Sequence, residues 1–198
     1  MVQTRSQSSA KRSADEDPAP PPAAAIFFTY LFLGALLSFC FGRDPGTPLP
    51  PGDDLAREIS PTIAIICLFL VSYSLLDVMA VGAAKQKYGF STKKFGSWAH
   101  NPPEEVHLAL RAQTNQVEQL PGFLIGSISF SILVNGTVGA VLSLVWVVLR
   151  RLYASRYRSA IGKTIKESGI ATFTIPAYFA LNAMLMGTAV QCLRTVRY

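Results

Sequence analysis

The chain has 198 residues, of which 50% are hydrophobic and 15% are charged, and its formal net charge is +6. That apolar content is more than one soluble core of this size needs, and it excludes an ordinary soluble domain. Because the charges are clustered, we attribute the positive excess to membrane topology and anionic lipid headgroups, and we expect no nucleic-acid partner.

The first part of the sequence predicts a tail, an apolar helix and a linker. Residues 1–22 hold almost no large apolar side chains, so we expect them to be disordered. Residues 23–42 are uncharged and predict a first transmembrane helix, and residues 43–60 form a Pro/Gly-rich linker. The apolar segment is either retained or removed as a signal sequence, and we expect retention because no small-x-small site follows it cleanly.

Residues 61–198 predict four further membrane helices, judged against the roughly 20 residues that cross a bilayer. The second span is apolar except for Asp77, which either pairs with a basic residue of a neighbouring helix or is solvated near the cytosolic end. The third span starts near Glu105 but is fully apolar only from Leu120 onward. The four spans cover residues 61–84, 105–134, 138–149 and 170–193.

Two connections are strongly basic, which indicates their side of the membrane. Lysines follow the second span, and arginines and lysines follow the fourth. Because Lys and Arg accumulate in short cytoplasmic loops, we expect both connections and the N-terminus to face the cytosol.

One stretch of the third span carries a polar face. Arg111, Asn115 and Glu118 are spaced i, i+4, i+7, so they share one side of a helix. Ionisable groups inside a membrane are costly unless they are paired or solvated, which favours a functional interpretation. The structural alternative is that Arg111 reaches the headgroups and Glu118 closes a hydrogen-bond network between helices.

A second cluster ends the fourth span. Arg150, Tyr153 and Tyr157 are spaced i, i+3, i+7, while Arg151 and Arg158 form an adjacent basic stripe. The alternative here is an aromatic and basic belt at the membrane interface. Cysteines and histidines show no metal-ligand spacing, so we expect no metal site.

These two clusters resemble the MAPEG family, the membrane-associated proteins of eicosanoid and glutathione metabolism. The resemblance rests on PPE at residues 102–104 followed by RAQxNxxExxP, and on the Arg-x-x-Tyr-x-x-x-Tyr pattern from Arg150. The family includes leukotriene-C4 synthase and the microsomal glutathione transferases. It implies an all-α, four-helix membrane bundle assembled as a homotrimer, here with an additional N-terminal transmembrane helix.

The resemblance further implies that glutathione binds between subunits. Arg111, Asn115 and Glu118 match the family's glutathione contacts, as do Arg150 and Tyr153. Gln113 matches as well, although it lies on the opposite helical face and has to serve another subunit or another part of the ligand. Glutathione carries two carboxylates and one ammonium group, so a site needs cations and a carboxylate.

Catalysis requires the glutathione thiolate, because the thiolate is the nucleophile. In the family member closest in motif, an arginine for this task follows the second tyrosine by seven residues, where this chain has Thr164. Arg158 or Lys163, with Lys166 as a further candidate, could supply the positive charge, and Tyr157 could supply a hydroxyl. Lysine does not reproduce the planar donor fork of arginine.

Two functions therefore stay open. The first is a glutathione transferase or peroxidase that acts on lipophilic electrophiles or lipid hydroperoxides from the bilayer. The second is a non-catalytic relative that binds lipid or acts as a scaffold subunit of a membrane complex. Matching site residues favour the first, while the missing arginine and the extra helix favour the second. Resemblance to the family implies an endoplasmic reticulum or related membrane.

Overall fold

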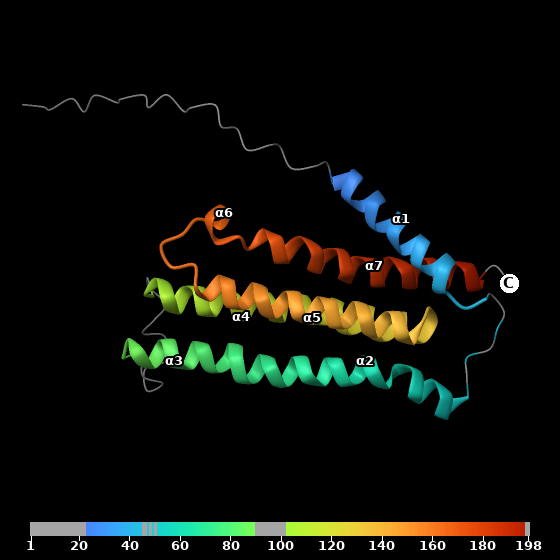
Figure 1. Cartoon of the computed structure of the whole chain (residues 1–198), viewed down its shortest axis with the longest axis horizontal. Coiled ribbons are helices and arrows are strands. Elements are labelled where there is room, and N and C mark those ends of the chain that lie inside the picture. The colour runs from blue at the N-terminus through green and yellow to red at the C-terminus, as the bar shows by residue number, and fades with distance from the viewer. Residues whose placement is uncertain (1–22, 45–46, 48, 50, 90–101, 197–198) are drawn as a thin grey trace, which may run out of the picture.

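The computed structural model describes residues 23–44, 47, 49, 51–89 and 102–196, and the elements in this part of the chain are all helices (Figure 1). The prediction of an all-α membrane bundle is confirmed. In chain order the elements are α1 (Ala23–Phe41), α2 (Gly52–Ser72), the π-helix η1 (Tyr73–Val78), α3 (Met79–Lys87), α4 (Glu104–Leu133), α5 (Gly136–Arg158), α6 (Ile165–Ser168) and α7 (Ala171–Val196).

Four long rods make up the bundle, and α1 lies outside them. The first rod is α2, η1 and α3 in continuous succession, and it packs along α4 and α5. On the other side, α7 packs against both α4 and α5 (Figure 1). The first helix, α1, packs on α7. The bundle therefore encloses its core between α2, α4, α5 and α7.

Three aromatic rings occupy the centre of this core. The rings of Phe123 and Trp146 are stacked with centroids 3.9 Å apart. Phe69 meets Trp146 edge to face at 5.2 Å, and all three side chains are almost completely buried. Offset stacked and edge-to-face pairs add to the stabilisation that area burial provides. This cluster holds α2, α4 and α5 together, and its Trp146 ring lies next to the polar residue Arg150.

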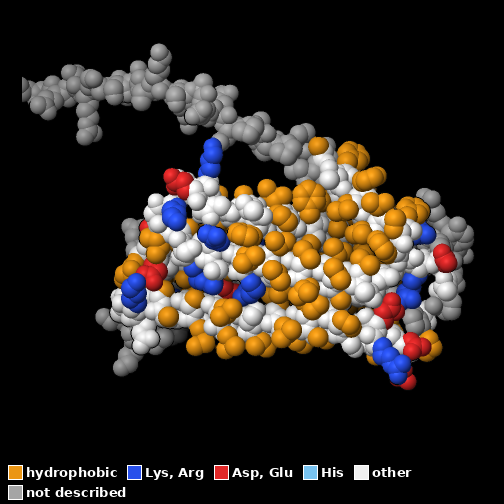
Figure 2. Space-filling model, in the orientation of Figure 1, with side chains coloured by type: hydrophobic (Ala, Val, Ile, Leu, Met, Phe, Trp, Pro, Cys, Tyr) orange, Lys and Arg blue, Asp and Glu red, His pale blue; other side chains and the backbone are white. Residues whose placement is uncertain are grey.

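Three helical segments are long and apolar enough to cross a membrane, namely Gly52–Lys87, Gly136–Arg158 and Ala171–Val196. A shorter apolar helix spans Phe27–Phe41. Hydrophobic side chains cover the middle of the visible flank, while charges gather toward both ends (Figure 2). Together these features describe an integral membrane protein. α4 does not meet the same composition requirement, although it has 30 residues, because its first half is polar.

The α2 helix begins earlier than the apolar pattern predicts. Its first residue is Gly52, so residues 52–60 of the predicted linker are helical. Pro51 takes the position before the first turn, and Asp53 and Asp54 lie within that turn. Carboxylates near a helix N-terminus interact favourably with the helix dipole. A hydropathy pattern does not detect this polar first part of α2, because it identifies only the apolar part of a helix.

The extra N-terminal helix is closely fitted to α7. A Cβ atom added at Gly34 would lie 2.4 Å from Cβ of Met186, so only a glycine permits this backbone approach. Farther along, the Ser38 hydroxyl donates to Gln191 Oε1 at 2.8 Å, and Gln191 Nε2 donates to the Arg43 carbonyl at 2.8 Å. Small residues and polar pairs of this kind fasten helices together in membranes.

The helix order brings both basic connections to the same end of the bundle. The chain leaves α3 and enters α4 at the end where it also leaves α5 and passes through α6 (Figure 1). Lys93 and Lys94, in the first connection, lie outside the described residues. Successive long helices thus run in opposite directions, as the charge pattern predicts.

Candidate functional site

The polar face of α4 is directed away from the bundle core. Arg111 and Glu118 are exposed, and Asn115 between them is half-buried. Within the described part of the chain, neither Arg111 nor Glu118 has a hydrogen-bond or ion-pair partner. A cation and a carboxylate are thus both available on one helix face, separated by two turns.

α5 supplies the second half of this site. The Asn115 side-chain amide donates a hydrogen bond to the Tyr153 hydroxyl. The Tyr157 ring lies beside the Tyr153 ring with centroids 5.5 Å apart, and Arg111 lies within electrostatic reach of the Tyr153 hydroxyl. The two clusters that the sequence singles out therefore meet at the contact between α4 and α5.

Arg150 lies beneath this surface and joins the two helices. Its side chain is buried, with Nε donating to Gln116 Oε1 at 3.0 Å and Nη2 donating to the Asn115 carbonyl at 2.7 Å. In return, Gln116 Nε2 donates to the Arg150 carbonyl at 3.0 Å. The guanidinium also lies 4.4 Å from the Tyr153 ring centroid. Arg150 thus positions Asn115 and Tyr153 and does not reach the outer surface.

Gln113 is turned away from Arg111 and Glu118, as its helical position predicts. Its side chain is half-buried, and Nε2 donates to the Tyr73 hydroxyl at 3.2 Å. Tyr73 opens η1, so this contact connects α4 to the α2–α3 rod. In a single chain Gln113 is therefore separate from the Arg111 face.

The three candidates for thiolate activation are placed differently from one another. The Arg158 guanidinium donates a hydrogen bond to Asp77 Oδ1. Arg158 therefore lies on a different face of α5 from Tyr153. Tyr157 is half-buried, and its hydroxyl makes no hydrogen bond within the described residues. Lys163 is exposed in the turn after α5. Thr164 caps α6 by accepting a hydrogen bond from the Glu167 amide, in the capping box that the two residues form.

Asp77, which the sequence left without an assignment, forms two ion pairs. Its side chain is 0% exposed, with Oδ2 2.6 Å from Arg151 Nη2 and Oδ1 paired with Arg158. The π-helical turn of η1 carries Asp77, and such turns change the direction of side chains relative to an α-helix. Of the two predicted alternatives, pairing with neighbouring basic residues is the one observed.

Two contributors were missed from the sequence, Gln116 and Tyr73. Gln116 lies on the buried stripe of α4 with Ala109, Ala112 and Phe123. A polar residue on an otherwise apolar stripe signals a buried hydrogen bond, so this partner of Arg150 could have been found by placing α4 on a helical wheel. Tyr73 gave no such signal, because its direction depends on the π-helical turn.

Comparison with known proteins identifies the family. The MAPEG family model matches residues 61–187, which covers more than half of the chain. The chain belongs to the MAPEG family. The matched region begins in α2 and ends in α7, so α1 lies outside it.

A relative from Synechocystis sp. supports the same relationship. It is 36% identical over 100 residues, which is 50% of this chain and 69% of that protein, and it is described as an uncharacterized protein. Membership in MAPEG supports a membrane function that is glutathione-transferase-like or related to it. Glutathione fits the donor set of this chain, because the exposed Arg111 and Glu118 complement a carboxylate and an ammonium group.

Proposed function

We propose that this MAPEG protein is a membrane-bound glutathione transferase or peroxidase that binds glutathione on the outward face of α4. The observation that carries the proposal is the line formed by Arg111, Asn115 and Glu118, in which the outer two are exposed without partners in the described residues. Charged groups in this position on a membrane bundle are stabilised by a ligand, a second protein surface or the lipid headgroups. Glutathione is a ligand with complementary charges.

The length of the site also suits the ligand. Arg111 and Glu118 are seven residues apart, which corresponds to about 10 Å along an α-helix. An extended tripeptide spans about the same distance. Arg111 binds the glycine carboxylate at one end, and Glu118 binds the ammonium group at the other. Asn115, held by Tyr153, contacts the middle of the peptide.

A second copy of the chain completes this site. The face of α4 is open in one chain, and Glu118 and Val117 are both exposed there. Covering the face with another subunit excludes water from the charge pairs and strengthens them. We therefore propose a homotrimer with glutathione between subunits, and Gln113 serves the ligand bound at the neighbouring interface.

Activation of the thiol requires a donor or a positive charge near the sulfur. The thiolate of bound glutathione adds to a lipophilic electrophile from the bilayer and forms a thioether. With a lipid hydroperoxide it attacks the O–O bond and releases the alcohol, and a second glutathione then converts the sulfenic product to the disulfide and water. Because Arg158 lies on a different face of α5 from Tyr153, where it pairs with Asp77, we assign the hydrogen bond to the sulfur to the Tyr157 hydroxyl. Lys163 adds positive charge near the end of α5 and lowers the thiol pKa.

A non-catalytic function is the second candidate, and two observations favour it. Arg158 is paired with Asp77, and Thr164 caps a helix where the family motif has an arginine. If no other group stabilises the thiolate, the same site binds glutathione or a lipid without activating it. A scaffold subunit of an endoplasmic reticulum complex would have this property.

The test is a titration of the detergent-purified full chain with glutathione, followed by ultraviolet difference spectroscopy and calorimetry in parallel. The proposal predicts saturable binding together with new thiolate absorbance at neutral pH. S-methylglutathione, which cannot form a thiolate, is the matched control and should bind without the absorbance change. Binding without thiolate, or absence of binding, contradicts the first candidate and supports the non-catalytic one.

A further inference from the structure

The other flank of α5 holds a charge cluster with an excess of positive charge. Two guanidinium groups, of Arg151 and Arg158, face the single carboxylate of Asp77. Their side chains are 17% and 25% exposed, respectively. Arg151 Nε and Nη1 are buried without a hydrogen-bond partner, and its guanidinium lies 4.9 Å from the Phe69 ring centroid.

Among the described residues, no carboxylate near the cluster is free to balance this excess. Glu105 is paired with Lys87 at 2.6 Å and accepts a hydrogen bond from Tyr88 at 3.0 Å. Glu104 accepts from the Gly162 amide at 2.9 Å. Residues 90–101, whose structure is not described, contain no Asp or Glu in their sequence. An uncompensated charge close to a membrane interior is costly, so an external anion is favoured there.

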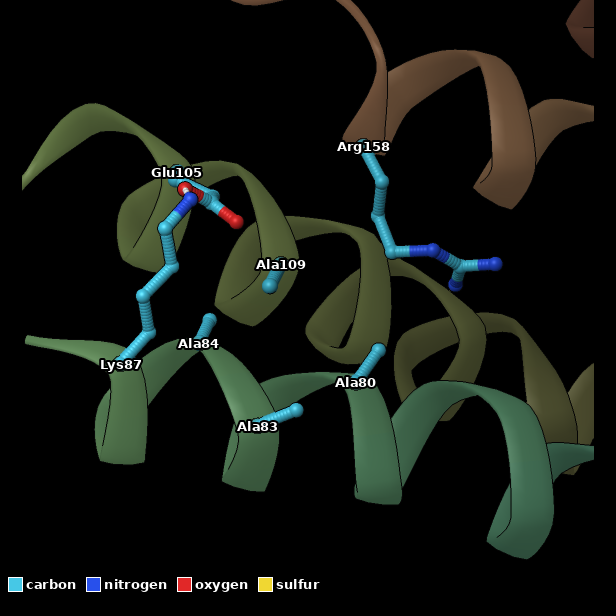
Figure 3. Close-up of a pocket in the computed structure, with 7 residues that line it drawn as sticks. All are labelled: Ala80, Ala83, Ala84, Lys87, Glu105, Ala109 and Arg158. Carbon is cyan, nitrogen blue, oxygen red and sulfur yellow. Dashed lines mark hydrogen bonds and ion pairs between the residues drawn. The ribbon is translucent and has the colours of Figure 1, made fainter.

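A cleft of about 290 Å³ lies beside this cluster, between α3, α4 and the end of α5. Arg158 is at one end of it and the Lys87–Glu105 pair is at the other, as Figure 3 shows. The floor between them consists of methyl groups, from Ala80, Ala83, Ala84 and Ala109. Small apolar side chains leave room for a hydrocarbon chain, and Arg158 has Nε and Nη2 without hydrogen bonds in the described residues.

The cleft lies near one end of the bundle, where the basic connections place the lipid headgroups. Ala80 is seven residues, or about 10 Å, from the end of α3 at Lys87. This is the end of the bundle that carries both basic connections. On the flank of the bundle, charged side chains interrupt the apolar surface at this level (Figure 2). An occupant with an anionic head and an apolar tail matches that position better than a soluble anion does.

We propose that this cleft binds an anionic membrane phospholipid. A headgroup phosphate oxygen accepts hydrogen bonds from Arg158, whose planar donor fork suits that geometry, and balances the charge left by the two arginines and Asp77. One acyl chain lies over the four alanines. The site is on a different face of α5 from Tyr153, so it does not depend on glutathione binding.

The test uses the delipidated full chain in a non-ionic detergent, with bound lipid counted by native mass spectrometry. Phosphatidylglycerol and phosphatidylcholine with identical acyl chains are the two probes, so only headgroup charge differs. Two variants address the site: Arg158→Gln removes the proposed anion contact, and Ala83→Leu fills the cleft without altering any charge. Arg156→Gln, which removes an exposed arginine of the same helix, is the matched control.

Wild-type protein should bind phosphatidylglycerol more tightly than phosphatidylcholine. Both site variants should lose about tenfold or more of that affinity, whereas Arg156→Gln should change it less than twofold. Oleate and inorganic phosphate, added as competitors, distinguish the sources of the anion. Competition by inorganic phosphate as strong as that by the lipid, or equal losses in Arg156→Gln and Arg158→Gln, would overturn the proposal.

Discussion

The two flanks of α5 use similar residues for different purposes. On the first flank, Arg150 is buried and fully engaged with α4, and the exposed polar groups lie beyond it on Arg111 and Glu118. On the second flank, Arg151 and Arg158 close on the buried carboxylate of Asp77. Arg150 and Arg151 are neighbours in the sequence, yet Arg150 supports the candidate binding site and Arg151 belongs to the charge cluster.

The comparison indicates that the role of a basic residue depends on its burial and on whether its partner is a neutral oxygen or a carboxylate. Arg150 donates to neutral oxygens of Gln116 and Asn115, so no carboxylate neutralises its charge, which favours an anionic group near Tyr153. Arg151 and Arg158 are held by an opposite charge, which binds α5 to the η1 turn. Perturbing one flank should therefore leave the other largely intact.

The largest effect is expected from Asp77→Asn. This change leaves two guanidinium groups without their carboxylate, and breaking a buried ion pair costs about 3 kcal/mol or more of unfolding free energy. The midpoint of thermal unfolding, followed by circular dichroism in detergent, should fall by roughly 6–12 °C. Asp54→Asn, at an exposed position of α2, serves as the control. A midpoint equal to that of the wild type would show that the cluster does not stabilise the bundle.

Arg111→Gln should act on the first flank without destabilising the protein. Losing a charged hydrogen bond to a carboxylate costs about 2 kcal/mol, so glutathione affinity should fall about 30-fold. The exposed Arg156 provides a matched control, and Arg156→Gln should bind glutathione with nearly wild-type affinity. Equal losses in the two variants would point to a general effect of surface charge.

Tyr153→Phe should give a smaller loss. The substitution keeps the ring next to Arg150 but removes the acceptor of the Asn115 amide, so Asn115 is less well positioned. A single neutral hydrogen bond contributes about 1 kcal/mol, which predicts roughly a fivefold weaker glutathione affinity by calorimetry. Affinity that stays at the wild-type value would remove Tyr153 from the site.

The smallest effect belongs to α6, which lies outside both flanks. Hydrogen bonds from the Thr164 backbone amide and hydroxyl hold the pKa of Glu167 below its ordinary value. Because the folded-state pKa is lowered, the capping contact is present near neutral pH and is lost as the pH falls through that pKa. The Thr164 amide resonance should shift in acid, and Glu167→Gln should abolish the titration. A titration that persists in the variant would assign it to another group.

Much of this architecture was predictable from local patterns. The long apolar spans and the i, i+4, i+7 face of Arg111 follow from hydropathy and helical periodicity, which need no tertiary information. The same periodicity indicates that Gln113 faces away from Arg111, and the structure agrees by placing it against Tyr73. Local sequence sufficed wherever one helix alone determines the answer.

Polar helix ends and features that depend on two helices were harder to predict. The start of α2 at Gly52 follows from charged residues in its first turn, which an apolar criterion does not register. Asp77 and Arg158 are 81 residues apart, so their pairing depends on the packing of the α2–α3 rod against α5 and on the π-helical turn. The choice between a thiolate-stabilising and a structural Arg158 could not be made from spacing alone.

The central claim is that the outward face of α4 binds glutathione, and Glu118 tests it most directly. Calorimetric titration with glutathione should compare the wild type, Glu118→Gln and the matched control Glu104→Gln, with the oligomeric state checked by native mass spectrometry. We predict that Glu118→Gln loses nearly all affinity while keeping the wild-type assembly, and that Glu104→Gln binds normally. Unchanged affinity in Glu118→Gln would contradict the assignment of the site.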